Sequence, residues 1–375
     1  MFRAFTVTIS VCFFILSTGA RAEFGPDLSK DSISVMSYNV ENLFDTDHDD
    51  GKDDYTFLPK SYAGKMAECA KIRIPTYREL CENTDWRSEL LNIKLGQIKR
   101  VIESQGFLPD IVGLTEVENE NVLNMLARTA GYDHFHITTG NDSRGIDVAL
   151  MFNETKLQYQ SHKEIDVSFK DNANMKTRNV MRVNFKLKTT KGSAAILAVY
   201  VSHWPSQSNP GKYRIAVAEI IKADIEKGAK EFGASNYHVL VMGDLNTTDD
   251  ETPNGIEGVL ASPKWTQHLY DSEVLAEGKG VKMIPPGTYF YKKDGRWNRL
   301  DRMLISKNMT TAGSIEADVK TFKNVAATFM TYVYRNKGGK EVPNVPIGYD
   351  FSAESADKAG FSDHLPVFMR LKITN

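Results

Sequence analysis

Short apolar segments recur along this chain, and many of them carry a polar side chain at one end. The segments are rich in Val, Ile, Leu or Met, and several alternate with polar residues as half-buried β-strands do. They lie at Ile33–Tyr38, Asp110–Thr115, Asp147–Phe152, Val180–Leu187, Ala194–Ser202, His238–Met242, Leu300–Ser306 and Pro366–Ile373. The flanking polar residues are Asn39, Glu116, His203, Asp244, Asp301, Asp363 and His364. If these side chains converge, some strands run toward the shared edge and others away from it, which requires antiparallel or mixed sheets.

Three segments between the strands have helical spacing. In Trp86–Gln105, an apolar face is formed by Leu91, Leu95, Ile98 and Ile102. Similar spacing covers Ile215–Ile225, and a shorter helix is predicted at Asn121–Ala130, before Gly131. The fold class is therefore α/β, with sheets covered by helices. A length of 375 residues suggests two or more domains, but a site drawn from positions 39 to 364 cannot be divided, so we expect one domain over residues 23–375.

The first 22 residues have the pattern of an export signal. Arg3 is followed by the apolar stretch Ala4–Leu16, and Ala20-Arg21-Ala22 matches a cleavage site. An uncleaved anchor is the alternative. We expect an exported protein, periplasmic or secreted, with no stable membrane association after cleavage. Cys69 and Cys81 have eleven residues between them, and they form either a disulfide in an oxidising compartment or two reduced thiols.

The composition excludes several classes of protein but does not identify binding partners. A hydrophobic fraction of 41% and a charged fraction of 25% exclude collagen-like, coiled-coil and disordered chains. The formal net charge of −2 gives no general attraction to nucleic acid. Binding of phosphate depends instead on Lys and Arg near the groove. Candidates for such a rim are Arg144, Arg178, Lys212, Arg214, Arg296, Arg299 and Arg302, with Trp204, Tyr289, Tyr291 and Trp297 as residues that stack on bases or pack in the core.

Six short motifs occur in order along the chain, and each is weak alone. They are Ser37-Tyr38-Asn39-Val40-Glu41-Asn42, the strand ending in Glu116, Ser202-His203-Trp204-Pro205, Gly243-Asp244-Leu245-Asn246, Leu300-Asp301-Arg302 and Ser362-Asp363-His364. Together they resemble the endonuclease/exonuclease/phosphatase superfamily, which has the deoxyribonuclease-I-like fold. The resemblance spans nearly all of the chain after residue 22. It implies a four-layer sandwich of two packed, mostly antiparallel or mixed sheets flanked by helices, with the site at one edge.

The chemistry of a phosphodiester explains these residue types. Its negative charge resists attack, so catalysis needs positioning and charge neutralisation by a hard divalent cation with oxygen ligands. The resemblance implies that the metal is bound by Asn39 and Glu116, with Asp363 and Glu41 as further ligands. Mg²⁺ is the expected ion, Mn²⁺ the second choice, and Ca²⁺ a possible accessory.

The resemblance also assigns the catalytic groups. His364 is paired with Asp301, His203 donates to a phosphate oxygen or the leaving group, and Asp244 and Asn246 position the nucleophile. Whether His364 or Asp244 is the base stays open. Substrate phosphate contacts are expected from Arg178, Arg144 and Asp147, for which a surface arginine or a turn aspartate is an equally good interpretation.

The segment at about 46–86 is predicted to be an insertion at the rim. Its first part, Asp45–Asp54, is rich in Asp but fails the EF-hand template, since Gly51 falls one place late and position twelve is Thr56. We expect a solvated acidic loop there.

These features predict a secreted nuclease that hydrolyses DNA or RNA phosphodiester bonds. The alternative is a phosphatase or phospholipase C-type phosphodiesterase of the inositol phosphate or sphingomyelin class. Two departures count against the inositol phosphatase branch: two extra residues between Trp297 and Asp301, and Thr247-Thr248 after Asn246. No protein partner is evident from the sequence.

Overall fold

Two six-stranded sheets form the centre of the protein in a computed structural model that describes residues 24–188 and 195–374. In the first sheet the strand order is β13 (Ile315–Asn324), β16 (Val367–Ile373), β1 (Ser32–Leu43), β2 (Ile111–Val117), β4 (Asp147–Phe152) and β3 (His134–Ile137). In the second it is β5 (Leu157–Ile165), β6 (Val180–Leu187), β7 (Ile196–Val201), β8 (Tyr237–Asp244), β12 (Asp301–Ser306) and β9 (Leu269–Asp271). The predicted signal peptide lies outside the described residues.

Each sheet is antiparallel except for one parallel pair. The parallel pairs are β1–β2 and β7–β8. Parallel neighbours need a crossover connection, and helices supply it: α3 (Ser88–Ile102) lies between β1 and β2, and α5 (Gly211–Phe232) lies between β7 and β8. The prediction of mixed sheets is confirmed.

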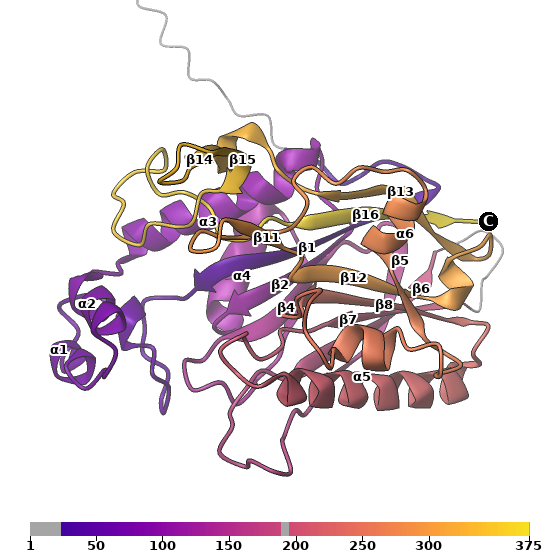
Figure 1. The fold of residues 1–375 in the computed structure, drawn as a ribbon, viewed down its shortest axis with the longest axis horizontal. Helices are drawn as coiled ribbons and strands as arrows, with labels where there is room; N and C mark the ends of the chain where they lie inside the picture. The colour runs from indigo at the N-terminus through magenta and orange to yellow at the C-terminus, as the bar shows by residue number, and fades with distance from the viewer. Residues whose placement is uncertain (1–23, 189–194, 375) are drawn as a thin grey trace, which may run out of the picture.

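The sheets pack face to face, and helices cover their outer faces (Figure 1). Between the sheets, Val35 and Leu150 of the first meet Val199 and Met242 of the second in one apolar cluster. Two further clusters join α3 and α4 (Glu120–Ala130) to the first sheet and α5 to the second. The predicted four-layer α/β sandwich is therefore present. Among the described residues, no helix combines the length and apolar character needed to cross a bilayer.

The inward face of α3 is the face that its spacing predicts. Leu91, Leu95, Ile98 and Ile102 are all buried. The helix is shorter than predicted, because a separate 3-10 turn at Glu103–Gln105 follows it. Lys94 lies on the same inward face and is also fully buried, which the apolar pattern does not predict.

The segment predicted to be a rim insertion folds into a 3-10 turn at Tyr55–Phe57 and two short helices, α1 (Lys65–Cys69) and α2 (Pro75–Asn83). The two helices lie beyond the end of β1 in Figure 1. Cys69 and Cys81 form a disulfide between them, which confirms that alternative. Cys81 is the one buried residue of α2, so this helix depends on the disulfide for its position.

The expectation of a solvated acidic loop is wrong for part of Asp45–Asp54. Asp45 and Asp54 are buried, and Asp45 accepts a hydrogen bond from Asn121 at 2.7 Å. Asp54 accepts one from the backbone of Asp49 at 2.7 Å. Both carboxylates are buried where they accept hydrogen bonds in and around the turn that follows β1.

The remaining elements are short and lie around the sandwich. Two two-stranded ribbons are formed by β10 (Tyr289–Tyr291) with β11 (Arg296–Asn298) and by β14 (Thr331–Arg335) with β15 (Glu341–Pro346). Helix α6 (Ser272–Gly278), a π-helical turn at Ile256–Leu260 and 3-10 turns at Lys307–Met309 and Thr328–Met330 complete the described elements.

Candidate active site

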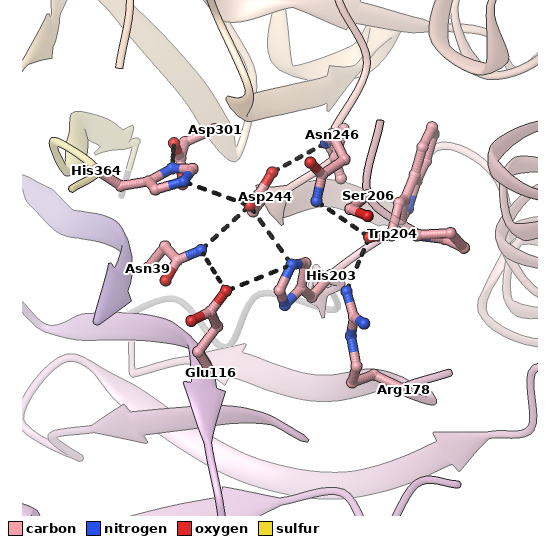
Figure 2. A network of polar contacts seen from close by, with 12 residues as sticks. Asn39, Glu116, Arg178, His203, Trp204, Ser206, Asp244, Asn246, Asp301 and His364 are labelled. Carbon is pink, nitrogen blue, oxygen red and sulfur yellow. Dashed lines mark hydrogen bonds and ion pairs between the residues drawn. The ribbon is translucent and has the colours of Figure 1, made fainter. Parts of the chain in front are cut away.

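The central strands of both sheets bring polar side chains to one end of the sandwich (Figure 2). Asn39 is on β1 and Glu116 on β2, which are parallel neighbours. Asp244 ends β8, and Asp301, which begins the antiparallel strand β12, lies directly opposite it. Strand-end residues far apart in the sequence therefore meet in one place, as the sequence predicts.

The backbone of β1 changes conformation just after Asn39. Glu41 and Asn42 have φ values of 52° and 59°, and Glu116 on β2 has a φ of 67°. The left-handed region is unfavourable for glutamate, less so for asparagine, and is often enforced by surrounding contacts at functional sites. Here the Glu41 N–H donates to Oδ1 of Asn39 at 3.0 Å, and the Asn42 N–H donates to Oε2 of Glu116 at 3.0 Å. The strained turn thus holds both side chains.

Asn39 connects the two sheets. Its Nδ2 donates to Oε1 of Glu116 at 3.3 Å and to Oδ2 of Asp244 at 3.1 Å. The side-chain oxygen of Asn39 faces the Glu41 amide. A single buried amide therefore orients a carboxylate from each sheet.

Asp244 is the centre of the network in Figure 2. Its Oδ1 accepts from the Asn246 N–H at 2.9 Å, and its Oδ2 lies 3.5 Å from Nε2 of His203 and 3.9 Å from Nε2 of His364. Burial, with the charge of Asp301, raises the pKa of Asp244 to about 7. Burial, together with nearby arginines, lowers the pKa of His203 well below its usual value. Asp244 therefore faces two imidazoles at hydrogen-bonding or slightly longer distance.

His364 is held by a buried carboxylate. Its Nδ1 lies 2.7 Å from Oδ2 of Asp301, which is fully buried, and its Nε2 is directed toward Asp244. The Asp301 N–H donates to the Thr288 hydroxyl at 3.1 Å, and the ring of Tyr289 lies 4.9 Å from the imidazole. Burial alone would lower the pKa of His364, but Asp301 and Asp244 raise it well above the usual value.

Glu41 and Asp363 lie together at the edge of the network. Oε2 of Glu41 accepts from the backbone N–H groups of Tyr349 at 2.7 Å and Asp363 at 2.8 Å. Burial and the charge of Asp363 raise the pKa of Glu41 to about 8, and burial also raises that of Asp363. Burial therefore destabilises both carboxylates as anions, with Asp363 acting on Glu41 and Glu116 acting on Asp363.

The donor set fits a hard divalent cation with few protein ligands. Among the described residues, no group of three or more His, Cys, Asp or Glu is arranged to enclose a metal. Mg²⁺ does not need such a cage, since it usually keeps several waters and takes one or two carboxylates. Glu116 with the Asn39 amide and Asp363 offers oxygen donors in a buried region, where burial and neighbouring carboxylates raise the pKa of Asp363 and of Asp244.

The predicted phosphate-contacting residues differ in what they contact. Arg178 is buried, and it donates to Oδ2 of Asp142 at 3.1 Å and to the Trp204 carbonyl at 2.8 Å. Arg144 also pairs with Asp142, but its side chain is 49% exposed. Burial lowers the pKa of Arg144, but the charges of Asp142 and Glu116 raise it above the usual value.

The Asp147 carboxylate is engaged in hydrogen bonds within the protein. It is buried, and its Oδ1 accepts from the Thr138 hydroxyl at 2.6 Å and the Gly140 N–H at 2.8 Å. Asn246 also has an internal partner, because its Nδ2 donates to the Trp204 carbonyl at 3.1 Å.

Several of the proposed rim residues are structural. Trp204 is fully buried, so it cannot stack on a base. Arg214 is buried, pairs with Glu251 at 2.7 Å and donates to three backbone carbonyls. The other cations pair with acids: Lys212 with Asp171, Arg296 with Asp250, Arg299 with Asp249 and Glu277, and Arg302 with Asp249 and Asp271. Tyr291 is 39% exposed, Tyr289 packs on His364, and Trp297 packs on Phe290 at 5.2 Å.

Sequence reasoning missed Lys94 and Tyr349. Lys94 donates to the Glu41 carbonyl at 2.8 Å, and burial lowers its pKa to about 8. Tyr349 supplies a backbone N–H to Glu41. Lys94 could have been found as a charged residue at an inward position of a predicted helix. Tyr349 could not, because a backbone N–H donor leaves no pattern in the sequence.

Comparisons with known proteins show which proteins share this fold. Solved structures with a similar fold include an endonuclease/exonuclease/phosphatase from Bacteroides vulgatus, at 13% identity and a TM-score of 0.54, covering 92% of this chain and 100% of that one. A mannosyl-6-phosphatase from Bacteroides thetaiotaomicron matches at 14% identity and a TM-score of 0.50, with 91% and 99% covered. The human Nocturnin catalytic domain with bound sulfate matches at 15% and 0.50, with 92% and 95% covered. At these identities the likeness shows a common fold.

Sequence comparison gives the family. A search of curated proteins found no matching sequence. A family model described as Endonuclease/Exonuclease/phosphatase family matches residues 77–373. That range includes Glu116, His203, Asp244, Asp301 and His364, and it begins after Asn39. The chain thus belongs to the endonuclease/exonuclease/phosphatase family, whose name describes enzymes that act on phosphate esters.

Proposed function

We propose that this protein is a metal-dependent phosphodiesterase that hydrolyses DNA or RNA by attack of an activated water. One observation carries the proposal: His364, oriented by Asp301, faces Asp244, which Asn39 joins to Glu116. Groups that can move a proton therefore lie beside oxygen donors suited to a hard cation. Hydrolysis of a phosphate ester needs both.

The proton of the attacking water is handled by His364 and Asp244 as a pair. Because Asp301 accepts from Nδ1–H of His364, the Nε2 atom is left facing Asp244 across 3.9 Å. A water that contacts both groups can transfer its proton to this pair as it attacks phosphorus. Asp301 stabilises the imidazolium form of His364 throughout, so that the pair can hold the additional proton.

Developing charge on the phosphate is met by His203, Asn246 and the metal site. Nε2 of His203 lies beside Asp244 and Glu116, at the centre of the network, where it can donate to a phosphate oxygen or the leaving group. When bound by Asn39, Glu116 and Asp363, Mg²⁺ or Mn²⁺ would neutralise phosphate charge as a Lewis acid. Oε2 of Glu41 accepts hydrogen bonds from two backbone N–H groups, one of them that of Asp363, so Glu41 helps to position this ligand.

Arg144 and Tyr77 favour a nucleic acid substrate. Arg144 is half-exposed, Tyr77 on α2 is 60% exposed, and the charges of Glu116 and Tyr77 both act to raise the pKa of Arg144. An exposed cation can contact a phosphate, and an exposed aromatic ring can stack on a base. We further propose that residues 1–22 direct export, so that the enzyme acts on substrate outside the cytoplasm.

The proposal is tested by incubating the enzyme with several different phosphate esters. Protein comprising residues 23–375 is incubated with Mg²⁺ and plasmid DNA, RNA, a phosphorylated sugar, a phosphoinositide or sphingomyelin. We expect cleavage of DNA or RNA that stops with a chelator and with His364→Ala. Turnover of a sugar phosphate or lipid without cleavage of either nucleic acid would replace the nuclease proposal with the phosphatase or phospholipase C alternative.

A further inference from the structure

A buried lysine contacts the backbone segment that carries candidate metal ligands. Lys94 on α3 has no exposed surface, and its Nζ lies 3.9 Å from the ring centre of Tyr349 and 5.0 Å from that of Phe351. Its Nζ donates a hydrogen bond to the Glu41 carbonyl, at 2.8 Å. Burying an ammonium group is costly unless it is compensated, and two aromatic faces and one carbonyl provide part of that compensation.

The carbonyl that Lys94 contacts belongs to a peptide group with a second partner. The Glu41 carbonyl and the Asn42 N–H are the two polar ends of one planar peptide unit, and they point in opposite directions. Lys94 binds the carbonyl end, and Oε2 of Glu116 accepts from the N–H end at 3.0 Å. The peptide group therefore lies between the Lys94 ammonium group and the Glu116 carboxylate. A cation at the oxygen polarises the peptide and strengthens the N–H as a donor.

The same peptide group fixes the turn that orients Asn39. Both residues of the unit, Glu41 and Asn42, are left-handed, with φ values of 52° and 59°. Such a conformation needs external contacts to persist. The preceding N–H, that of Glu41, donates to Oδ1 of Asn39. If the Glu41–Asn42 peptide rotated, the hydrogen bond to Glu116 would be lost, and the adjoining Val40–Glu41 peptide, whose N–H donates to Asn39, would lose the neighbour that fixes it.

We propose that Lys94 is a positioning residue that presets Asn39 and Glu116 for a divalent cation by holding the Glu41–Asn42 peptide. The proposal rests on the metal-dependent function proposed above. Lys94 touches neither substrate nor metal, and it acts through one peptide group. Its removal should weaken metal binding more than a comparable loss of stability elsewhere would.

The chain contains a matched control in Lys65. This residue is also fully buried, and its Nζ donates to the backbone carbonyls of Leu58 at 2.6 Å, Thr84 at 2.7 Å and Thr56 at 3.1 Å. It has the same chemistry as Lys94 but stabilises the rim insertion. None of its hydrogen-bond partners belongs to the Asn39–Glu116 network.

The experiment compares Lys94→Met with Lys65→Met in the protein comprising residues 23–375. Mn²⁺ binding is measured by calorimetry and electron paramagnetic resonance, and stability by thermal unfolding. We expect Lys94→Met to weaken Mn²⁺ binding at least tenfold, with a similar fall in kcat/KM at fixed metal. Lys65→Met should lose stability yet bind Mn²⁺ within twofold of the wild type.

Equal Mn²⁺ affinity of wild type and Lys94→Met would overturn the positioning role and leave the enzyme function intact. Absence of Mn²⁺ and Mg²⁺ binding in the wild type would instead remove the metal-dependent function on which the role depends. If Lys94→Met does not fold, Lys94→Gln, which keeps an N–H donor without the charge, takes its place. The same tenfold loss of affinity is expected, and unchanged affinity would again overturn the role.

Discussion

The His364 imidazole has its two nitrogens in different surroundings, and a single residue determines which of them carries the proton. Asp301 is fully buried and accepts from Nδ1, so Nε2 is left toward Asp244. In Asp301→Asn the shape is nearly kept, but the charge that stabilises the imidazolium is lost. We expect kcat to fall by about 100-fold or more, measured on the substrate that the wild type cleaves.

Stability provides the control for Asp301→Asn. The Asn oxygen can still accept the Nδ1–H, so thermal unfolding should change little compared with the loss of activity. A variant with nearly wild-type kcat would show that Asp301 has only a packing role and that the imidazole needs no carboxylate partner.

Arg178 and Arg144 look equivalent in the sequence but should respond differently to substitution. Arg178 is buried between Asp142 and the Trp204 carbonyl, so Arg178→Met leaves buried acceptors unpaired and should cost about 2–4 kcal/mol of unfolding free energy. Arg144 is half-exposed. Arg144→Met should leave stability within about 0.5 kcal/mol and reduce kcat/KM about tenfold or more through loss of one phosphate contact.

Urea unfolding and steady-state kinetics on both arginine variants check this contrast. The opposite pattern, with Arg144→Met unstable and Arg178→Met stable but inactive, would mean that Arg178 is the phosphate-contacting residue. Sequence could not separate the two, because burial of Arg178 is set by Asp142 and Trp204, which are 36 and 26 residues away from it in the chain.

Helix α2 depends on a single covalent link. Cys81 is its only buried residue, and the disulfide to Cys69 closes a short loop. In the double variant Cys69→Ser, Cys81→Ser we expect a local loss of about 2–3 kcal/mol, as is typical for a loop of this length. The exposed cleavage sites at Lys71 and Arg73 should become more sensitive to trypsin.

The sandwich itself should be less affected by loss of the disulfide. Limited trypsin digestion followed by mass spectrometry locates the first cuts, and thermal unfolding reports on the core. Unchanged protection of residues 70–83 would show that packing, rather than the disulfide, holds α2. If Tyr77 contacts substrate, the double variant should also lose affinity for nucleic acid.

At the scale of elements, sequence predicted some features and could not predict others. The spacing of Leu91, Leu95 and Ile98 identified the inward face of α3, because helical periodicity is a local property. The inward position of Lys94 depends on the left-handed turn at Glu41 within β1 and on Tyr349, which are distant in sequence. Likewise, the buried state of Asp45 depends on Asn121, on another element.

For the whole molecule, the order of strand-end residues was the strongest signal. Positions 39, 116, 244, 301 and 364 could meet only in antiparallel or mixed sheets, and the sheets are mixed, with β1–β2 and β7–β8 as the parallel pairs. Sequence did not indicate how the sheet edges meet. Edge strand β3 of the first sheet and edge strand β5 of the second bring His136 and His162 into a stack, with ring centres 4.0 Å apart.

This contact between the sheets should make the folded state sensitive to acid. Burial, with the charges of His162 and His134, lowers the pKa of His136 to about 4 from its usual 6.5. A lowered histidine pKa means that the unfolded chain takes up a proton more readily, so the contribution to stability is complete above pH 6.5 and is lost as the pH falls toward 4. Tyr159, which bonds to His162 at 2.7 Å, also faces this group.

His136→Phe keeps a ring in the stack and removes the titrating group. Compared with the wild type, its unfolding free energy should rise by about 1 kcal/mol between pH 7.5 and pH 4.5, a value reduced for the partial exposure of the ring. Urea unfolding across this range measures the difference. A stability difference that stays constant with pH would show that His136 does not link the two sheets to acid sensitivity. A difference that grows only below pH 6.5 would locate the acid-sensitive step at the edge where β3 and β5 meet.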